Sequence, residues 1–141
     1  MENRVISALI DTGFFLSVLD ADDKRHATCA AALAAEPNPL LPEAILPELA
    51  YMTVRELGYP VMVRFLQSLA AGELTLVSSE PQDFARAAAL MSRYADARVD
   101  YVDCMIFALA ERLGVTRILT LDQRHFRLFR PRHCPAFELL P

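Results

Sequence analysis

The chain has 141 residues, of which 54% are hydrophobic and 23% are charged, and its formal net charge is −4 at pH 7. This composition excludes a disordered polar chain, and the length suits a single domain, residues 1–141, with a sizeable core. The negative net charge argues against indiscriminate binding to nucleic acid.

Two features bear on the cellular compartment. Residues 1–4 and the short apolar run 5–10 do not form a signal-peptide pattern, and no apolar run is long enough to span a membrane. The cysteines match neither a disulfide framework nor a zinc motif: Cys29, Cys104 and Cys134. We therefore expect a cytoplasmic protein that does not enter the membrane.

In the first half of the chain, apolar runs alternate with helical patterns. Residues 5–10 indicate a buried strand that ends at Asp11, and a second short strand is expected around Leu40. Prolines at helix starts and glycines after helix ends support the helical segments. Helices are expected at residues 14–19, 27–35, 47–57 and 60–69.

The same alternation continues in the second half. A strand is expected at 74–77, and a helix follows at 81–94. A second helix runs from Asp100 to Leu113 and stops at Gly114. Further strands are expected at 118–121 and, as a last edge strand, at 137–140. Strands that alternate with helices predict an α/β domain with a mainly parallel sheet.

Several carboxylates are expected at one edge of this sheet. Asp11 and Asp122 each follow a buried strand, and ligands bind beyond the carboxyl ends of strands in open α/β sheets. Asp103 lies in the first turn of the helix that leads to the strand of Asp122, and Glu48 lies near the start of another helix. Asp100 shares a helix face with Asp103.

Such a cluster favours a bound cation, because neighbouring carboxylates repel one another. Without a nearby cysteine or histidine pair the ligands are all oxygens, which favours Mg²⁺ or Mn²⁺ over zinc. Ions of this kind activate water and stabilise the leaving oxygen of a phosphodiester. The alternatives are structural: Asp100 as a helix N-cap, Asp103 as a partner of the helix dipole, and Asp122 as the start of a polar turn.

Arginines are concentrated near the end of the chain, at Arg124, Arg127, Arg130 and Arg132. Arginine forks match phosphate geometry, so Arg124 and Arg127 are candidates for binding a substrate backbone. The alternative is an ordinary solvated surface.

The chain resembles the PIN-domain ribonucleases, especially the VapC-like toxins of toxin–antitoxin pairs. The resemblance covers nearly all of the chain and rests on these segments: IDTGFFLSVLDADDKRH, LPELAYM, YADARVDYVDCMIFALAERLGV, RILTLDQRHF and FRLFRPRHCPAFELLP. It implies a three-layer α/β/α sandwich with a parallel central sheet. It also implies hydrolysis of RNA with Mg²⁺ or Mn²⁺, a homodimer and a cognate antitoxin.

The resemblance also assigns roles to residues. It implies that the metal ligands are Asp11, Glu48, Asp103 and Asp122, with Asp100, Thr120 and Thr12 as accessory residues. Gly13 is a departure, since many relatives carry serine there. The change removes one polar contact but no carboxylate.

Rival interpretations fit less well. A phosphate-accepting receiver domain needs a late lysine, and none follows Lys24. A haloacid-dehalogenase-like phosphatase needs a second aspartate where Gly13 stands. An Asp-Thr-Gly aspartic protease would be all-β. The serious alternative is a PIN-fold module that binds RNA or a partner without cutting, and the presence of all four acids favours the nuclease.

Overall fold

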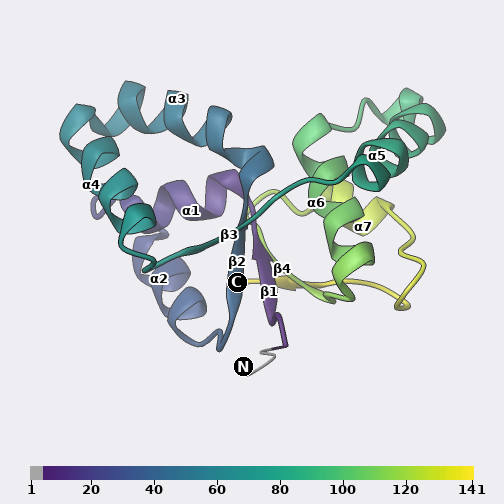
Figure 1. Cartoon of the computed structure of the whole chain (residues 1–141), viewed down its shortest axis with the longest axis horizontal. Coiled ribbons are helices and arrows are strands. Elements are labelled where there is room, and N and C mark those ends of the chain that lie inside the picture. Colours follow the sequence, from purple (N-terminus) through teal and green to yellow (C-terminus); the bar gives the residue numbers. More distant parts are fainter. Residues whose placement is uncertain (1–4) are drawn as a thin grey trace.

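A five-stranded parallel sheet runs through the middle of the protein (Figure 1). The computed structural model describes residues 5–141, so the expectation for residues 1–4 lies outside the described part. The strand order is β3-β2-β1-β4-β5, and every neighbouring pair is parallel. The strands are β1 (Ala8–Ile10), β2 (Pro39–Pro42), β3 (Thr75–Val77), β4 (Arg117–Leu119) and β5 (Glu138–Leu140). The expected parallel sheet is confirmed.

Helices form a layer on each side of the sheet (Figure 1). One layer holds α1 (Thr12–Leu19), α2 (His26–Ala34), α3 (Leu46–Leu57) and α4 (Tyr59–Ala70). The other holds α5 (Pro81–Arg93), α6 (Tyr101–Leu113) and α7 (Arg124–Leu128). Short 3-10 turns, η1 (Glu43–Ile45) and η2 (Ala95–Ala97), precede α3 and α6. This arrangement is the three-layer α/β/α sandwich that the resemblance implies.

The core is centred on β1 and α6. All of β1 is buried, and α6 is buried without a break from Val102 to Ala110. A helix that is apolar on every side belongs in an interior, and α6 lies between the sheet and α5. Beside it, the rings of Phe107 and Phe129 pack edge to face with centroids 4.9 Å apart. This contact packs α6 against the residue that ends α7.

Some expected boundaries were wrong. The first strand covers 8–10 rather than 5–10, and Val5 is 87% exposed. The first helix begins at Thr12 rather than at residue 14, because the Asp11 carboxylate accepts a hydrogen bond from the Thr12 amide. The strand expected at 118–121 is β4, Arg117–Leu119. The short helix α7 was not foreseen, because five residues are too few to show a periodic pattern.

Two expectations about the whole chain can be compared with the structure. No disulfide links Cys29, Cys104 or Cys134, which are all free thiols. In the part of the chain that the structure describes, no helix has the length and apolarity needed to cross a membrane.

Candidate active site

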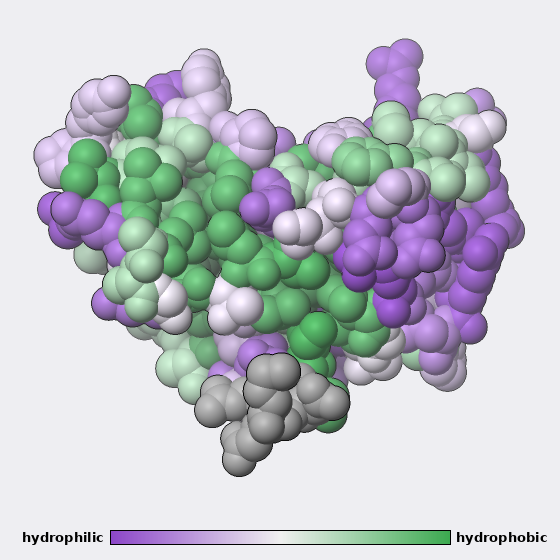
Figure 2. All heavy atoms as spheres, viewed as in Figure 1, coloured by the Kyte–Doolittle hydropathy of each residue, from purple (hydrophilic) through white to green (hydrophobic). Residues whose placement is uncertain are grey.

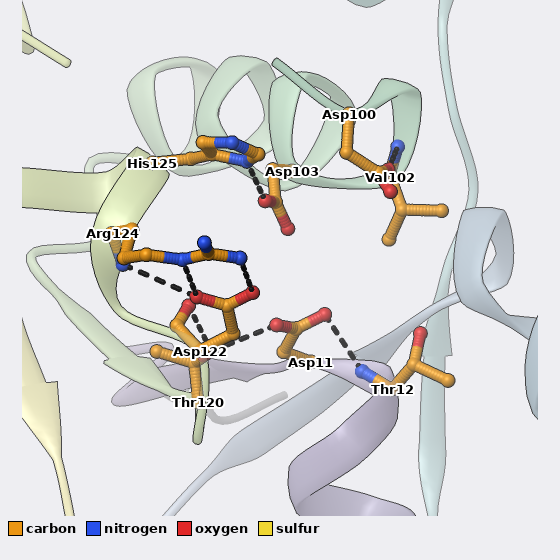
Figure 3. A network of polar contacts seen from close by, with 9 residues as sticks. All are labelled: Asp11, Thr12, Asp100, Val102, Asp103, Thr120, Asp122, Arg124 and His125. Atoms are coloured by element: carbon orange, nitrogen blue, oxygen red, sulfur yellow. Dashed lines mark hydrogen bonds and ion pairs between the residues drawn. The ribbon is translucent and has the colours of Figure 1, made fainter. Parts of the chain in front are cut away.

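A cleft of about 730 Å³ opens at the carboxyl edge of the sheet, between the two helical layers. Strands β1 and β4 are neighbours, so the chain segments that follow them leave the sheet side by side. The structure brings all five acids expected at this edge into the lining of the cleft: Asp11, Glu48, Asp100, Asp103 and Asp122. Figure 3 shows that Asp11, Asp103 and Asp122 come from three different elements and face a common space.

Asp11 lies at the junction of β1 and α1 and is only 8% exposed. Its Oδ1 accepts a hydrogen bond of 2.7 Å from the Thr12 amide, and its Oδ2 accepts one of 2.8 Å from the Thr120 hydroxyl. Burial raises the pKa of Asp11, and the charges of Glu48 and Asp100 add to the rise, while the two hydrogen bonds oppose it. This carboxylate is therefore held in place but stays electrostatically unfavourable.

Asp103 lies in the first turn of α6 and is also only 8% exposed. Burial and then the charge of Asp11 raise its pKa to about 7. One of its oxygens, Oδ2, lies 2.6 Å from Nδ1 of His125 on α7, which lowers the pKa in part. The rise is the behaviour expected of two like charges in a poorly solvated space.

Asp100 behaves as a helix cap. Its Oδ1 accepts a hydrogen bond of 2.6 Å from the Val102 amide, and its backbone is extended, as at an N-cap. The side chain nevertheless lines the cleft, and its charge raises the pKa of both Asp11 and Asp103. Asp100 thus starts α6 and adds negative charge to the site at the same time.

Asp122, which follows β4, is more exposed to solvent than Asp11, which follows β1. The side chain of Asp122 is 55% exposed. Both of its oxygens are bonded to the guanidinium of Arg124, each at 3.1 Å. These hydrogen bonds lower the pKa of Asp122. An exposed ion pair of this kind contributes about 0–1 kcal/mol to stability, so a stronger ligand can displace Arg124 readily.

The remaining predicted residues lie around this centre. Glu48 is exposed in the first turn of α3 and faces the cleft. The Thr120 hydroxyl, besides its bond to Asp11, lies 3.1 Å from the carbonyl oxygen of Asp122. The Thr12 hydroxyl is buried and has no hydrogen-bond partner among residues 5–141. A buried hydroxyl in this state has its donor and acceptor capacity free for a ligand or a water.

The donor set fits a hard divalent cation in its chemistry. All the acids offer oxygen, and burial raises the pKa of both Asp11 and Asp103, a shift that a cation beside them would oppose. Within the described residues, no three acidic, cysteine or histidine side chains are arranged to hold an ion as they stand. Asp122 is turned to Arg124 and Asp103 to His125, so metal binding would require these side chains to rearrange.

Sequence reasoning did not identify three cleft residues: His125, Arg98 and Arg25. His125 stands three residues after Asp122 but bonds to Asp103, a contact across the fold that no local pattern shows. Of the arginines predicted to bind substrate, Arg124 lines the cleft. Arg127 lies farther along α7, where its guanidinium donates to the Gln123 side chain at 2.6 Å.

Comparison with known proteins points to one family. A family model described as "PIN domain" matches residues 8–130. Ribonuclease VapC26 of Mycobacterium tuberculosis is 29% identical over 134 residues, which cover 94% of this chain and 99% of that protein.

Solved structures show the same fold. The toxin VapC20 of Mycobacterium tuberculosis, described as cleaving the sarcin-ricin loop, is 20% identical with a TM-score of 0.73 over 79% of this chain and 87% of its own. VapBC2 of Rickettsia felis, solved with a DNA fragment of its promoter, is 12% identical with a TM-score of 0.68 over 95% of this chain and 97% of that chain.

The raised pKa of Asp103 predicts an unusual pH dependence of metal-free stability. The folded protein keeps a proton up to about pH 7 that the unfolded chain releases near the ordinary value of 3.8. The free energy of unfolding should therefore fall as pH rises through this range, and the fall should shrink in Asp103→Asn. Thermal or urea unfolding in EDTA at several pH values measures both proteins.

Asp96→Asn is the matched control, because Asp96 is an exposed aspartate in η2 and should leave the pH profile unchanged. If Asp103 served only the dipole of α6, Asn at position 103 would cost about 0.5–1 kcal/mol near neutral pH. A variant weakened in that way, with the parent's pH profile, would contradict the account of a crowded carboxylate.

Proposed function

The chain belongs to the PIN-domain family, and from this premise we propose that it is a divalent-metal-dependent endoribonuclease and the toxin of a toxin–antitoxin pair. Residues 1–141 form one PIN-like domain in this proposal, and the protein acts in the cytoplasm. The observation that carries the proposal is the buried pair Asp11 and Asp103, whose pKa values are both raised within one cleft. The relatives VapC26, described as a ribonuclease, and VapC20, described as a sarcin-ricin loop cleaving toxin, support it.

We assign the metal ligands to four acids of the cleft: Asp11, Glu48, Asp103 and Asp122. When Mg²⁺ or Mn²⁺ is bound, its chemistry is to lower the pKa of a water and to stabilise the leaving oxygen of the phosphodiester. Carboxylate oxygens and the phosphates of a substrate are the ligands that Mg²⁺ prefers. In this proposal no serine, cysteine or histidine acts as a covalent nucleophile.

The surrounding residues orient these acids. Thr120 fixes the rotation of the Asp11 carboxylate, and His125 does the same for Asp103. The free hydroxyl of Thr12 can hold a water beside Asp11. Once Asp122 turns to a cation, the guanidinium of Arg124 is released at the cleft, where it can bind a substrate phosphate. Arg127 would then contact the RNA backbone farther along α7.

An apolar hollow offers a place for the antitoxin. It measures about 420 Å³ and lies between α1, α2 and α4, with a mainly hydrophobic lining that includes Phe15, Leu33 and Phe65. Figure 2 shows hydrophobic residues over the α4 side and across the middle of the same face, whereas hydrophilic residues gather over the α5 side. We propose that an amphipathic segment of the antitoxin covers this hollow, as hydrophobic grooves commonly bind helices.

Cleavage of RNA by this protein should depend on a divalent metal ion. The purified protein should cut single-stranded or looped RNA with Mg²⁺ or Mn²⁺ and stop when EDTA removes the ion. Asp11→Asn and Asp103→Asn should each lower the rate by about a hundredfold or more, because each removes an anionic ligand that water cannot replace. Gel analysis of labelled RNA, with Asp96→Asn as the control, measures the cleavage rate.

Cleavage that continues unchanged in EDTA would contradict the metal mechanism. RNA binding without cleavage would favour the non-catalytic alternative.

The protein should form a homodimer through α3 and α4. Helices α3 and α4 expose large apolar side chains, with Tyr51 66% and Tyr59 70% exposed and Val54 42% exposed. Such a patch on an isolated chain indicates an interface. Sedimentation at micromolar concentration should give the dimer mass, and Tyr51→Glu combined with Val54→Glu should give the monomer. Phe84→Glu, on α5 of the other layer, should leave the dimer intact. A parent protein that sediments only as a monomer would refute this assignment.

A further inference from the structure

The cleft has far more negative than positive charge for a site that is to admit RNA. In the described part of the chain its lining includes seven carboxylates but only three arginines: Arg25, Arg98 and Arg124. A bound metal ion would offset part of the negative charge, but the phosphates on either side of the cut bond would also lie close to these acids. The arginines that are not already paired with a carboxylate can bind those phosphates and will therefore control the affinity for RNA.

The three arginines differ in how far they are already engaged. Arg124 donates to both oxygens of Asp122. The Nε of Arg25 lies 3.9 Å from Asp23, a loose and partly exposed contact. Arg98 makes no side-chain hydrogen bond or ion pair within residues 5–141, although it lines the cleft and is exposed. Its whole guanidinium fork is thus available to a phosphate.

The backbone of Arg98 is in an unfavourable conformation. With φ 50° and ψ 49° it is left-handed, and no other non-glycine residue of the described part has a positive φ. Glycine would adopt this conformation without a steric cost. The conformation ends the η2 turn, where a left-handed residue is common, but arginine occupies the position although glycine would fit it at lower cost.

The strained turn also places Arg98 rigidly. Its amide donates to the Ala95 carbonyl at 3.1 Å, which closes the η2 turn. The next residue, Val99, is buried at 5% exposure, and Asp100 then caps α6. The arginine is therefore held between two fixed points, immediately before the helix that carries Asp103.

Arg25 stands on the opposite wall. It is the residue before α2, in the helical layer that also carries α1, whereas Arg98 belongs to the layer of α5 and α6. The Arg25 amide donates a hydrogen bond of 2.7 Å to Asp23 Oδ1, and the residue lines the cleft. The two arginines thus stand on either side of the acidic centre.

We infer that Arg98 and Arg25 bind the RNA phosphates that flank the cut bond, one on each wall, so that a strand is held across the acidic centre. The inference rests on the proposed function, since it takes RNA as the ligand. It adds these two arginines to the arginines of α7, for which the sequence predicts the same binding role. Arg98 and Arg25 are substrate-binding residues in this inference, and the metal-binding acids carry the chemistry.

The test measures RNA binding apart from cleavage. Anisotropy of a labelled single-stranded RNA of mixed sequence is followed over a salt series in Ca²⁺, an oxygen-binding ion with less strict geometry than Mg²⁺. Arg98→Ala, Arg98→Gly and Arg25→Ala should each weaken binding about tenfold, as expected for one charged hydrogen-bonded contact. Each should flatten the salt slope by about 0.7, and the double variant by about twice as much because the two sites are separate.

Controls separate a binding role from a structural one. Arg64→Ala removes the same charge from α4, outside the cleft, and should leave affinity and slope unchanged. Arg98→Lys should keep most of the slope. Arg98→Gly should melt no lower than the parent, because glycine relieves the left-handed strain while the phosphate contact is lost.

The inference would be overturned if Arg98→Gly bound RNA with the affinity and salt slope of the parent. It would also be overturned if Arg64→Ala lost as much RNA affinity as the Arg98 variants, or if the parent did not bind RNA at all. Cleavage by the parent in Mg²⁺ tests the proposed function separately. Cleavage with unchanged binding in Arg98→Gly would remove this inference alone. Binding that depends on Arg98 without any cleavage would remove the nuclease alone.

Discussion

Burial of several carboxylates at one edge of the sheet is the constraint on which the site depends. Strand β1 lies beside β4, so the chain leaves the sheet with Asp11 next to the segment of Asp122, and the buried helix α6 adds Asp103 from above. Burial is the largest cause of the raised pKa at both Asp11 and Asp103. The packing that builds the core therefore also creates an unfavourable concentration of negative charge, because water that would screen it has been removed.

Neighbouring polar groups each stabilise one of these carboxylates by hydrogen bonding. Thr120 and the Thr12 amide bind Asp11, His125 binds Asp103, and Arg124 binds Asp122. Each partner lowers the pKa of its carboxyl in part, yet the pKa of Asp103 stays at about 7. A divalent cation would act on all the acids together, which explains why the same residues that disfavour the metal-free state favour a metal site.

Local patterns predicted the parts of the fold that depend on local physics. The parallel sheet and the stop of α6 at Gly114 follow from apolar runs and glycine geometry, and the cap at Asp100 was one of two alternatives that the pattern left open. Burial of Asp103 is not visible in the local pattern, since it depends on the packing of α6 within the fold. The contact of His125 with Asp103 and the place of Arg98 in the cleft arise from tertiary packing of short segments that carry no periodic signal.

The central claim is that a divalent cation replaces protons in this cluster. Isothermal titration of Mg²⁺ into the metal-free protein at pH 6, in two buffers of different ionisation enthalpy, measures the protons released on binding. The account predicts binding with proton release, because Asp103 with a pKa of about 7 is still protonated at that pH, and it predicts that Asp103→Asn loses most of both. Absence of Mg²⁺ binding in the parent, or binding without proton release that Asp103→Asn leaves unchanged, would contradict it.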